Sequence, residues 1–341
     1  MDLRAREVWT CWPSVAASRS DLPVRSITPP TSLVTPSTTQ GWGKVASRRP
    51  PAARHYAGAV AIDLHTHSTA SDGTEAPSVV VERAVEAGLT TVALTDHDTT
   101  LGWREAADAA RAHGIRLVRG IEVSCSRRHQ SIHLLAYLPD PDHPALVAEL
   151  ARARESRDTR LDRMVGLMAA DGIPVTVDSV RAEVEEGATA GRPHIADALV
   201  SAGVVQHRDE AFVRFLGNAS RYYVSHYAPD PVRAVELVRA AGGVPVIAHP
   251  RSVTRGRVVE DALVEELVSA GLLGIEVHHR DHTPEAVRHL TDLARSLGVL
   301  ATGSSDYHGE GKLNRLGENT TAPTVLEAIE ELASGSSVVE Q

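Results

Sequence analysis

The chain of 341 residues has little cysteine, little lysine and no long apolar run, and these shortages exclude several classes of protein. Its two cysteines, Cys11 and Cys125, cannot form the disulfide framework of a secreted domain, so we expect a cytoplasmic protein. Cys125 lacks a protease-like context and is predicted to be a small buried residue. No apolar run approaches the ~20 residues of a membrane-spanning helix, so we expect no membrane partner.

Charge is distributed unevenly along the chain. Residues 1–57 carry eight Lys and Arg against three acidic residues, a net +5, so the total of −9 leaves −14 for the remainder. An acidic body argues against binding long DNA through a basic face. Residues 1–57 are rich in Ser, Thr, Pro and Arg and show no periodicity, which predicts a disordered tail or an over-extended start of the reading frame. Their acid-poor composition also suits an organellar transit peptide.

Histidine is abundant, with 17 residues, and the first cluster lies in Asp63-Leu64-His65-Thr66-His67-Ser68. This stretch follows a short apolar run, which predicts a strand. Two histidines at i and i+2 of an extended segment point to the same face. Two imidazoles on one face can begin a metal site, although a His-rich turn without any ligand is the competing interpretation.

From residue 59 onward, the pattern alternates between strand and helix. This alternation predicts an α/β protein with a parallel sheet or barrel, whose active site lies at the carboxyl ends of the strands. Residues 141–228 break the alternation, being strongly helical and highly charged, and we predict an inserted helical subdomain there. Segments 58–140 and 229–325 would then form the barrel. The expected strands are 59–64, 91–95, 115–121, 132–138, 244–248, 272–277 and 299–303, and the main expected barrel helices are 77–87, 102–113, 231–241, 258–270 and 284–297.

Of nine candidate nitrogen and oxygen donors, seven fall at the carboxyl ends of these strands, while Asp72 lies in a loop and His133 begins its strand. Scattered structural histidines would not gather there, so we predict one shared site. Nine donors exceed the needs of one ion but suit three ions that share a bridging carboxylate. Imidazole–carboxylate mixtures suit Mn, Fe or Zn, and cations about 3.5–4 Å apart serve phosphoester hydrolysis. The nine candidates are His65, His67, Asp72, His97, Glu122, His133, His249, Asp306 and His308.

The motifs around these residues resemble those of the PHP-domain phosphoesterases, over residues 61–320. Within that family, the match is to the group of the 3′,5′-nucleoside bisphosphate phosphatases and the short-RNA exonuclease RNase AM. The resemblance rests on Asp63-Leu64-His65-Thr66-His67-Ser68 with Asp72-Gly73-Thr74, Thr95-Asp96-His97-Asp98, Gly120-Ile121-Glu122, Ile132-His133-Leu134-Leu135, Gly191-Arg192-Pro193-His194, Ala248-His249-Pro250 and Gly303-Ser304-Ser305-Asp306-Tyr307-His308.

The resemblance implies a distorted (β/α)7 barrel with a trinuclear site, holding three divalent ions with manganese as the first choice. By position, His65, His67, Glu122 and Asp306 would hold one ion. Glu122 would bridge to a second ion, completed by His133 and His249. The third ion would be held by Asp72, which replaces a histidine of some relatives, together with His97 and His308.

The implied function is hydrolysis of nucleotide phosphoesters, namely 3′,5′-bisphosphonucleotides and/or short 5′-phosphorylated RNA, by a metal-bound hydroxide. Arg192 and His194 would reach the substrate phosphate, where an Arg fork is well suited. The alternative for Arg192 is a helix-start arginine on a solvated face. The sequence sets no oligomeric state.

Three other functions compete with this one. A phosphatase of the same superfamily could act on histidinol phosphate or nucleoside monophosphates. A C–N hydrolase of the amidohydrolase type is disfavoured, because Lys44 and Lys312 are the only lysines and neither ends a mid-barrel strand. A non-catalytic PHP module is disfavoured, because the ligand set is intact.

Several further residues carry weaker predictions. Asp63 and Asp96 could orient neighbouring histidines or could simply form turns. Arg251 could contact an anion. Glu276, His278 and His279 are interpreted as wall residues of the site. Surface or loop positions are expected for His113, His129, His143, His207, His226, His282 and His289.

Overall fold

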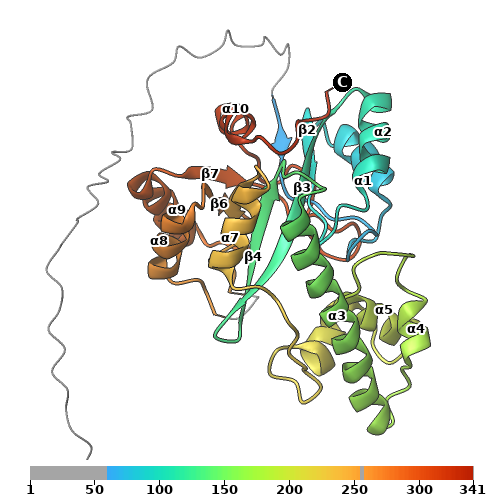
Figure 1. Cartoon of the computed structure of the whole chain (residues 1–341). Coiled ribbons are helices and arrows are strands. Elements are labelled where there is room, and N and C mark those ends of the chain that lie inside the picture. Colours follow the sequence, from blue (N-terminus) through green and yellow to red (C-terminus); the bar gives the residue numbers. More distant parts are fainter. Residues whose placement is uncertain (1–59, 254–256, 341) are drawn as a thin grey trace, which may run out of the picture. The chain divides into compact units, whose positions relative to one another are not determined.

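The computed structural model describes residues 60–253 and 257–340, and the predicted tail over 1–57 lies outside the described residues. One mixed sheet of seven strands, in the order β1 to β7, forms the centre of the fold (Figure 1). The strands are β1 (Ile62–Asp63), β2 (Thr91–Leu94), β3 (Arg116–Arg127), β4 (Gln130–Tyr137), β5 (Val244–Ile247), β6 (Gly274–His278) and β7 (Leu300–Gly303).

The two edges of the sheet approach one another just beyond β1 and β7. The amide of His67 donates to the carbonyl of Tyr307 at 2.8 Å, and the amide of Tyr307 donates to the carbonyl of His65 at 3.3 Å. A parallel bridge joins Thr66 to Tyr307 at the same place. The sheet is therefore a nearly closed seven-stranded barrel, which confirms the predicted fold class.

The direction of β4 differs from the prediction of a parallel sheet. β4 pairs antiparallel with both β3 and β5, whereas the remaining neighbours pair parallel. The cause is a two-residue turn in which Arg128 and His129 have φ angles of 50° and 64°. Positive φ at both central residues is the type I′ geometry, which matches the twist of a hairpin. Because β4 runs backwards, the first residues of β4 lie at the same end of the barrel as the last residues of its neighbours.

Helices that follow the strands cover the barrel. Proline begins most of these helices, since its fixed φ suits the first turn. The barrel helices are α1 (Pro77–Glu86), α2 (Trp103–His113), α7 (Pro231–Ala240), α8 (Asp261–Ala270), α9 (Pro284–Leu297) and α10 (Pro323–Leu332). No helix was expected at α10. It buries Leu326 and Ile329 against Ile62, and continues past residue 325.

The segment between β4 and α7 has a hydrophobic cluster of its own. Leu161 and Met164 of its longest helix pack with Ile195, Leu199 and Leu216. We call residues 141–228 the cap, and the boundaries of this unit remain a prediction. Among the described residues, no helix is both long enough and apolar enough to cross a bilayer. The cap elements are α3 (Pro144–Ala170), α4 (Val177–Arg181), α5 (Arg192–Ser201), α6 (Arg208–Ala211) and the π-helix η1 (Phe212–Leu216).

The cap lies against the loops that follow the barrel strands. Arg154 of α3 donates to the carbonyl of Asp98 at 2.6 Å. The amide of Thr189 donates to the carbonyl of Ala70 at 3.0 Å. Arg208 donates to the carbonyl of Asp72, also at 3.0 Å. Figure 1 shows α3 beginning beside β4 and running towards the lower right, where α4 and α5 lie next to it.

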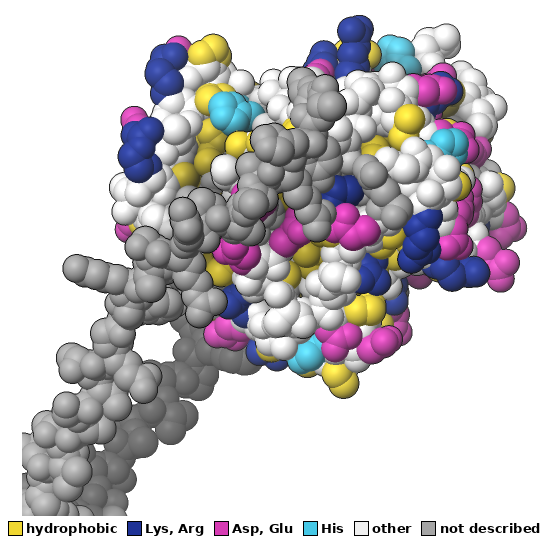
Figure 2. All heavy atoms as spheres, turned by 90° about the horizontal axis from the view of Figure 1, so that it is seen from above, with side chains coloured by type: hydrophobic (Ala, Val, Ile, Leu, Met, Phe, Trp, Pro, Cys, Tyr) yellow, Lys and Arg dark blue, Asp and Glu magenta, His cyan; other side chains and the backbone are white. Residues whose placement is uncertain are grey.

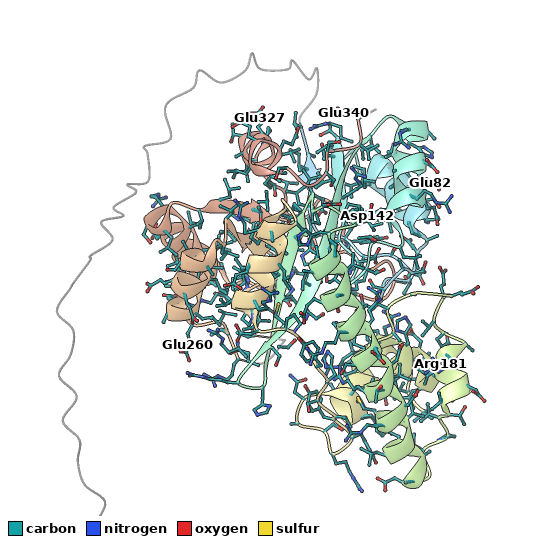
Figure 3. The ribbon with its side chains drawn as sticks, in the orientation of Figure 1. Glu82, Asp142, Arg181, Glu260, Glu327 and Glu340 are labelled. Carbon is teal, nitrogen blue, oxygen red and sulfur yellow. The ribbon has the colours of Figure 1, made fainter. Side chains whose placement is uncertain are left out.

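The opposite end of the barrel carries the C-terminal segment. In Figure 3, Glu327 and Glu340 lie at this end, whereas Arg181 lies on the outer edge of the cap. Arg116 of β3 contacts Glu330 at 2.9 Å and Glu340 at 3.0 Å there. Where Figure 2 shows described residues on this face, acidic and basic side chains are interspersed. Such mixing gives no single-sign field for nucleic acid on that part of the surface.

Candidate metal centre

The structure brings all nine predicted donors together at the end of the barrel that faces the cap. His65, His67 and Asp72 follow β1, and His97 follows β2. His249 follows β5, whereas Asp306 and His308 follow β7. His133 lies near the start of β4, where the antiparallel direction of that strand brings it to the same end. The remaining donor, Glu122, lies in β3, so the β3–β4 hairpin supplies two of the nine donors: Glu122 and His133.

Glu122 occupies a different position from the predicted one. The sequence predicts that its strand ends at Ile121, but β3 continues to Arg127 because it pairs with β4 over its second half. Glu122 thus lies in mid-strand. It nevertheless marks the rim of the barrel, since an isolated parallel bridge from His97 to Glu122 lies just beyond the parallel pairing of β2 with β3.

A first group of donors surrounds two imidazole nitrogens. Nε2 of His65 and Nε2 of His67 lie 3.1 Å apart. Oε2 of Glu122 lies 3.2 Å from the former and 3.0 Å from the latter. Oδ1 of Asp306 lies 3.4 Å and 3.5 Å from the same two atoms. Two nitrogens and two oxygens therefore converge on one point.

A second group surrounds the other oxygen of Glu122. Nδ1 of His133 lies 2.7 Å from Oε1, and Nε2 of His249 lies 2.9 Å from the same atom. Nδ1 of His97 instead lies 3.4 Å from Oε2, the oxygen that contacts the first group. Glu122 thus stands between the first group and the second.

A third group surrounds Asp72. Nε2 of His308 lies 3.2 Å from Oδ1 of Asp72, and Nε2 of His97 lies 3.7 Å from Oδ2. Nδ1 of His67 lies 3.6 Å from Oδ1. His67 and His97 therefore join this group to the other two.

The donor set fits divalent cations. Oε2 of Glu122 and Nδ1 of His97 are buried and make no hydrogen bond. Leaving a buried carboxylate oxygen without a hydrogen bond is costly, and a cation would remove that cost. One donor atom per residue lies within 4.8 Å of the others in each of three sets, namely His65, His67, Glu122 and Asp306; His67, Asp72, His97 and His308; and His97, Glu122 and His133. Imidazole and carboxylate donors without thiolate suit Mn, Fe or Zn.

The charges of this cluster shift its protonation. Burial alone would lower the pKa of His67, but the neighbouring carboxylates of Asp306 and Glu122 outweigh this effect and raise that pKa to about 9. Burial likewise opposes ionisation of Glu122, yet the imidazoles of His133 and His97 hold its pKa well below the usual range. Glu122 is therefore ionised, and protons on His65 and His67 balance part of the negative charge until a cation takes their place.

Asp63 and Asp96 accept hydrogen bonds from loops that are distant in sequence, and no contact with a histidine ring is seen among the described residues. Asp63 accepts hydrogen bonds from the amides of Ser305 at 3.0 Å and Gly317 at 2.9 Å. Asp96 accepts hydrogen bonds from the amide of Ser68 at 2.8 Å and from the Ser71 hydroxyl at 2.6 Å. Both carboxylates thus join loops that carry the donors across long stretches of the chain, a role that differs from the two that were predicted.

Two residues interpreted as wall residues contact the donors directly. Oε1 of Glu276 lies 3.0 Å from Nδ1 of His65. Nε2 of His279 lies 3.5 Å from Oδ2 of Asp306, and the Lys312 ammonium lies 2.9 Å from the same oxygen. His282, expected at the surface, is only 8% exposed, and its Nδ1 lies 2.8 Å from the carbonyl of Val277.

The structure places the two predicted substrate contacts at the start of α5. Arg192 donates to the carbonyl of Leu216 at 2.8 Å and to the side chain of Asn218 at 2.9 Å. Its guanidinium also lies over the Phe212 ring, 5.4 Å from the centroid. His194 is buried, and its Nδ1 accepts from the amide of Gly191 at 3.0 Å.

Other basic side chains of the cap were missed by the sequence analysis. Arg160 is only 7% exposed and donates to the carbonyl of Val224 at 2.8 Å, while its Nη2 is buried without a hydrogen bond. Burial, followed by the charge of Arg192, lowers the pKa of the Arg160 guanidinium. Burial, followed by the charges of Arg157 and Arg160, lowers the pKa of His226 to about 3. We call Arg157, Arg160, Arg192 and His226 the basic group.

The basic group adjoins the metal donors. Arg157 lies 2.9 Å from Oδ2 of Asp98, which follows His97, and also donates to the hydroxyl of Ser124. Ser124 pairs with His133 across the hairpin. An anion held by these arginines would therefore lie beside the second group of donors.

Comparison with known proteins agrees with this geometry. The PHP domain family matches residues 63–192. A 3′,5′-nucleoside bisphosphate phosphatase of Chromobacterium violaceum is 35% identical over 269 residues, covering 79% of this chain and 94% of the relative. A 5′-3′ exoribonuclease of Haemophilus influenzae is 34% identical over 258 residues, covering 75% of this chain and 93% of the relative.

A solved structure supports the same assignment. A protein of Bifidobacterium adolescentis, considered to be a metal-dependent phosphoesterase, superposes with a TM-score of 0.79 at 40% identity. The match covers 81% of this chain and 98% of that protein. The chain therefore belongs to the PHP-domain family of metal-dependent phosphoesterases.

Proposed function

We propose that the chain hydrolyses nucleotide substrates that carry two phosphate groups, either 3′,5′-bisphosphonucleotides or short 5′-phosphorylated RNA. The observation that carries the proposal is the basic group beside the metal donors. Arg160 has a buried guanidinium nitrogen without a hydrogen bond, which favours an anionic partner. One phosphate would bind at the metal centre and the other at the basic group. The two relatives named above act on such nucleotides or on RNA.

Three divalent ions, manganese first and iron or zinc as alternatives, are part of the proposal. His65, His67, Glu122 and Asp306 would hold one ion, while Glu122, His133 and His249 would hold a second. Asp72, His97 and His308 would hold the third. When bound, such ions supply Lewis-acid polarisation of phosphoryl oxygens and lower the pKa of a water molecule.

The protein's own residues would bind and orient the substrate. Arg192 and His194 begin α5, and the guanidinium of Arg192 is held by Leu216 and Asn218 in one orientation. A fixed guanidinium loses little conformational entropy when it binds a phosphate. The cap would exclude bulk water from the site, because Arg154 and Thr189 tie it to the loops that carry the donors.

The test is a hydrolysis assay on protein that has been reconstituted with Mn²⁺ and analysed for metal. Bisphosphonucleotides, nucleoside monophosphates, histidinol phosphate and 5′-phosphorylated di- to pentanucleotides are compared by phosphate release and product analysis. We expect kcat/KM for substrates with two phosphates to exceed that for monophosphates by about tenfold or more, since a second charged contact is lost in the latter. Equal rates would favour the small-molecule phosphatase, and no release from any substrate would contradict the proposal.

A cytoplasmic location without membrane contact completes the proposal. It rests on the buried, unpaired thiol of Cys125, which a reducing compartment preserves. The acidic body also makes long DNA an unsuitable partner.

A further inference from the structure

β6 supplies no proposed metal ligand, yet it carries a fully buried carboxylate at the centre of the site. Glu276 is 0% exposed and faces segments that follow three other strands. A buried carboxylate is retained only where its oxygens are well satisfied by hydrogen bonds or charges. The contacts of Glu276 therefore indicate what it does there.

Each oxygen of Glu276 contacts a segment that carries a proposed ligand. Oε1 lies 3.0 Å from Nδ1 of His65 and also accepts from the hydroxyl of Ser304, two residues before Asp306. Oε2 accepts from the backbone amide of His249 at 2.6 Å. The carboxylate thus joins the loops that follow β1, β5 and β7.

The contact with His65 determines which ring nitrogen carries the proton. An ionised carboxylate can only accept hydrogen bonds, so Nδ1 of His65 must be the donor. Nε2 is then the nitrogen that can bind a cation together with Glu122 and Asp306. At many metal sites, a carboxylate accepts a hydrogen bond from the non-coordinating nitrogen of a ligand histidine and so fixes its tautomer and ring orientation.

The contact with His249 holds an unusual backbone conformation. His249 has a φ of 31°, a backbone angle that residues other than glycine seldom adopt. The hydrogen bond from its amide to Glu276 compensates for part of the cost of that conformation. The ring of His249 is thereby directed at Oε1 of Glu122.

We infer that Glu276 is a positioning residue that sets the tautomer of His65 and the backbone of His249, and so prepares the sites of two metal ions at once. This inference rests on the proposed ligand set. It does not require that the substrate be a nucleotide.

Glu276→Gln tests the inference with almost no change of shape. A glutamine has one acceptor oxygen, but three donors face this side chain, so one orientation leaves the His249 amide opposed by an NH₂ group. The other orientation presents NH₂ to His65 and favours the tautomer with the proton on Nε2. Both orientations weaken a metal site.

The measurement is Mn²⁺ binding to the full chain, stripped with chelator, followed by equilibrium dialysis and elemental analysis. We expect Glu276→Gln to weaken binding about 10–100-fold, as removal of a ligand's supporting carboxylate typically does. Ser304→Ala, which keeps the carboxylate, should cost less than about threefold. Glu265→Gln, the same change at an exposed position of α8, should bind like the wild type. Binding of Glu276→Gln within twofold of wild type would overturn the inference.

A second measurement uses the wild-type fold, in case Glu276→Gln does not fold. Long-range ¹H–¹⁵N spectra of the Zn²⁺-loaded chain report histidine tautomers, and His65→Gln assigns the signal. We expect a proton on Nδ1 of His65, and a proton on Nε2 would overturn the inference. Both experiments are independent of turnover. A chain that binds metal but releases no phosphate would refute the proposed function and leave this inference standing.

Discussion

Nδ1 of His133 lies 2.7 Å from Oε1 of Glu122, although these residues belong to adjacent strands of opposite direction. The hairpin turn at Arg128 and His129 produces this contact, because it folds β4 back along β3. Through its two oxygens, Glu122 touches donors from every one of the three groups. Its removal should therefore affect more than one ion.

Glu122→Gln should lower both metal content and rate. The change removes the negative charge that lies between His65, His133 and His249, so these imidazoles lose their shared partner. We expect a loss of about 100-fold or more in kcat/KM, since even supporting residues of a metal site cost about 10–100-fold. Elemental analysis and phosphate release measure the two effects. Glu260→Gln, at an exposed position, is the control, and near-wild-type activity of Glu122→Gln would refute the bridging role.

Asp72→Ala should remove one ion and leave the others. Asp72 contacts His308 at 3.2 Å and His97 at 3.7 Å, which belong to the third group. Metal content per chain should fall by one ion relative to wild type when both are dialysed against the same Mn²⁺ solution. Loss of all bound metal would show that the three groups are not separate sites.

The fold was predictable to the extent that local patterns determine it. Proline at the first position of helices and β-branched residues in strands predicted most elements, because both preferences depend only on neighbouring residues in the sequence. The direction of β4 was not predictable from alternation, since it depends on the φ angles of Arg128 and His129. α10 was missed although its sequence is amphipathic; its buried residues Leu326 and Ile329 pack in the same cluster as Ile62, at the other end of the barrel sequence.

The metal donors were predictable from the sequence, but the buried residues that contact or adjoin them were not. The spacing of His65 and His67, at i and i+2, predicts that both face the same side, because successive side chains of a strand alternate between its two faces. Glu276 was interpreted as a wall residue, since its contact with His65 spans 211 positions and no local pattern reports it. The same is true of Arg160, whose position within a long charged helix looks like a solvated face although the side chain is buried.

Deleting residues 1–57 should leave fold and activity intact. The segment is Ser-, Thr-, Pro- and Arg-rich without periodicity, and such compositions bury too little apolar surface to support a core. A chain that starts near Val60 should therefore keep its melting temperature within about 2 °C and its kcat/KM within twofold, as small changes at a terminus usually do. Thermal unfolding and the hydrolysis assay measure both, and a loss of either would assign a role to the segment.

Arg192→Lys should raise KM for substrates with two phosphates. Lysine loses the planar fork and the contact with the Phe212 ring, so the charge is held less firmly. We expect a rise of about tenfold for bisphosphonucleotides, with metal content unchanged. Nucleoside monophosphates, which lack the second phosphate, should be affected less. Arg214→Lys, on the exposed side of η1, is the matched control. Equal effects on both substrates would place Arg192 outside the site of the second phosphate.

His226 should make stability depend on pH in a direction that can be tested. Its pKa in the folded chain is lowered to about 3, by burial and then by the charges of Arg157 and Arg160. In the unfolded chain it should titrate near 6.5. Between these values the unfolded chain binds more protons, so the free energy of unfolding falls as the pH drops from about 6.5 towards about 3.

The comparison of wild type with His226→Gln isolates this contribution. Because the side chain is partly exposed, we expect the wild type to lose about 2 kcal/mol more than the variant between pH 7 and pH 4. Urea unfolding of metal-free protein at both pH values measures the difference between the two proteins. Phosphate in the buffer should diminish the effect, because an anion at the basic group favours protonated His226. Parallel stability curves for the two proteins would mean that His226 does not experience the charges of the neighbouring arginines.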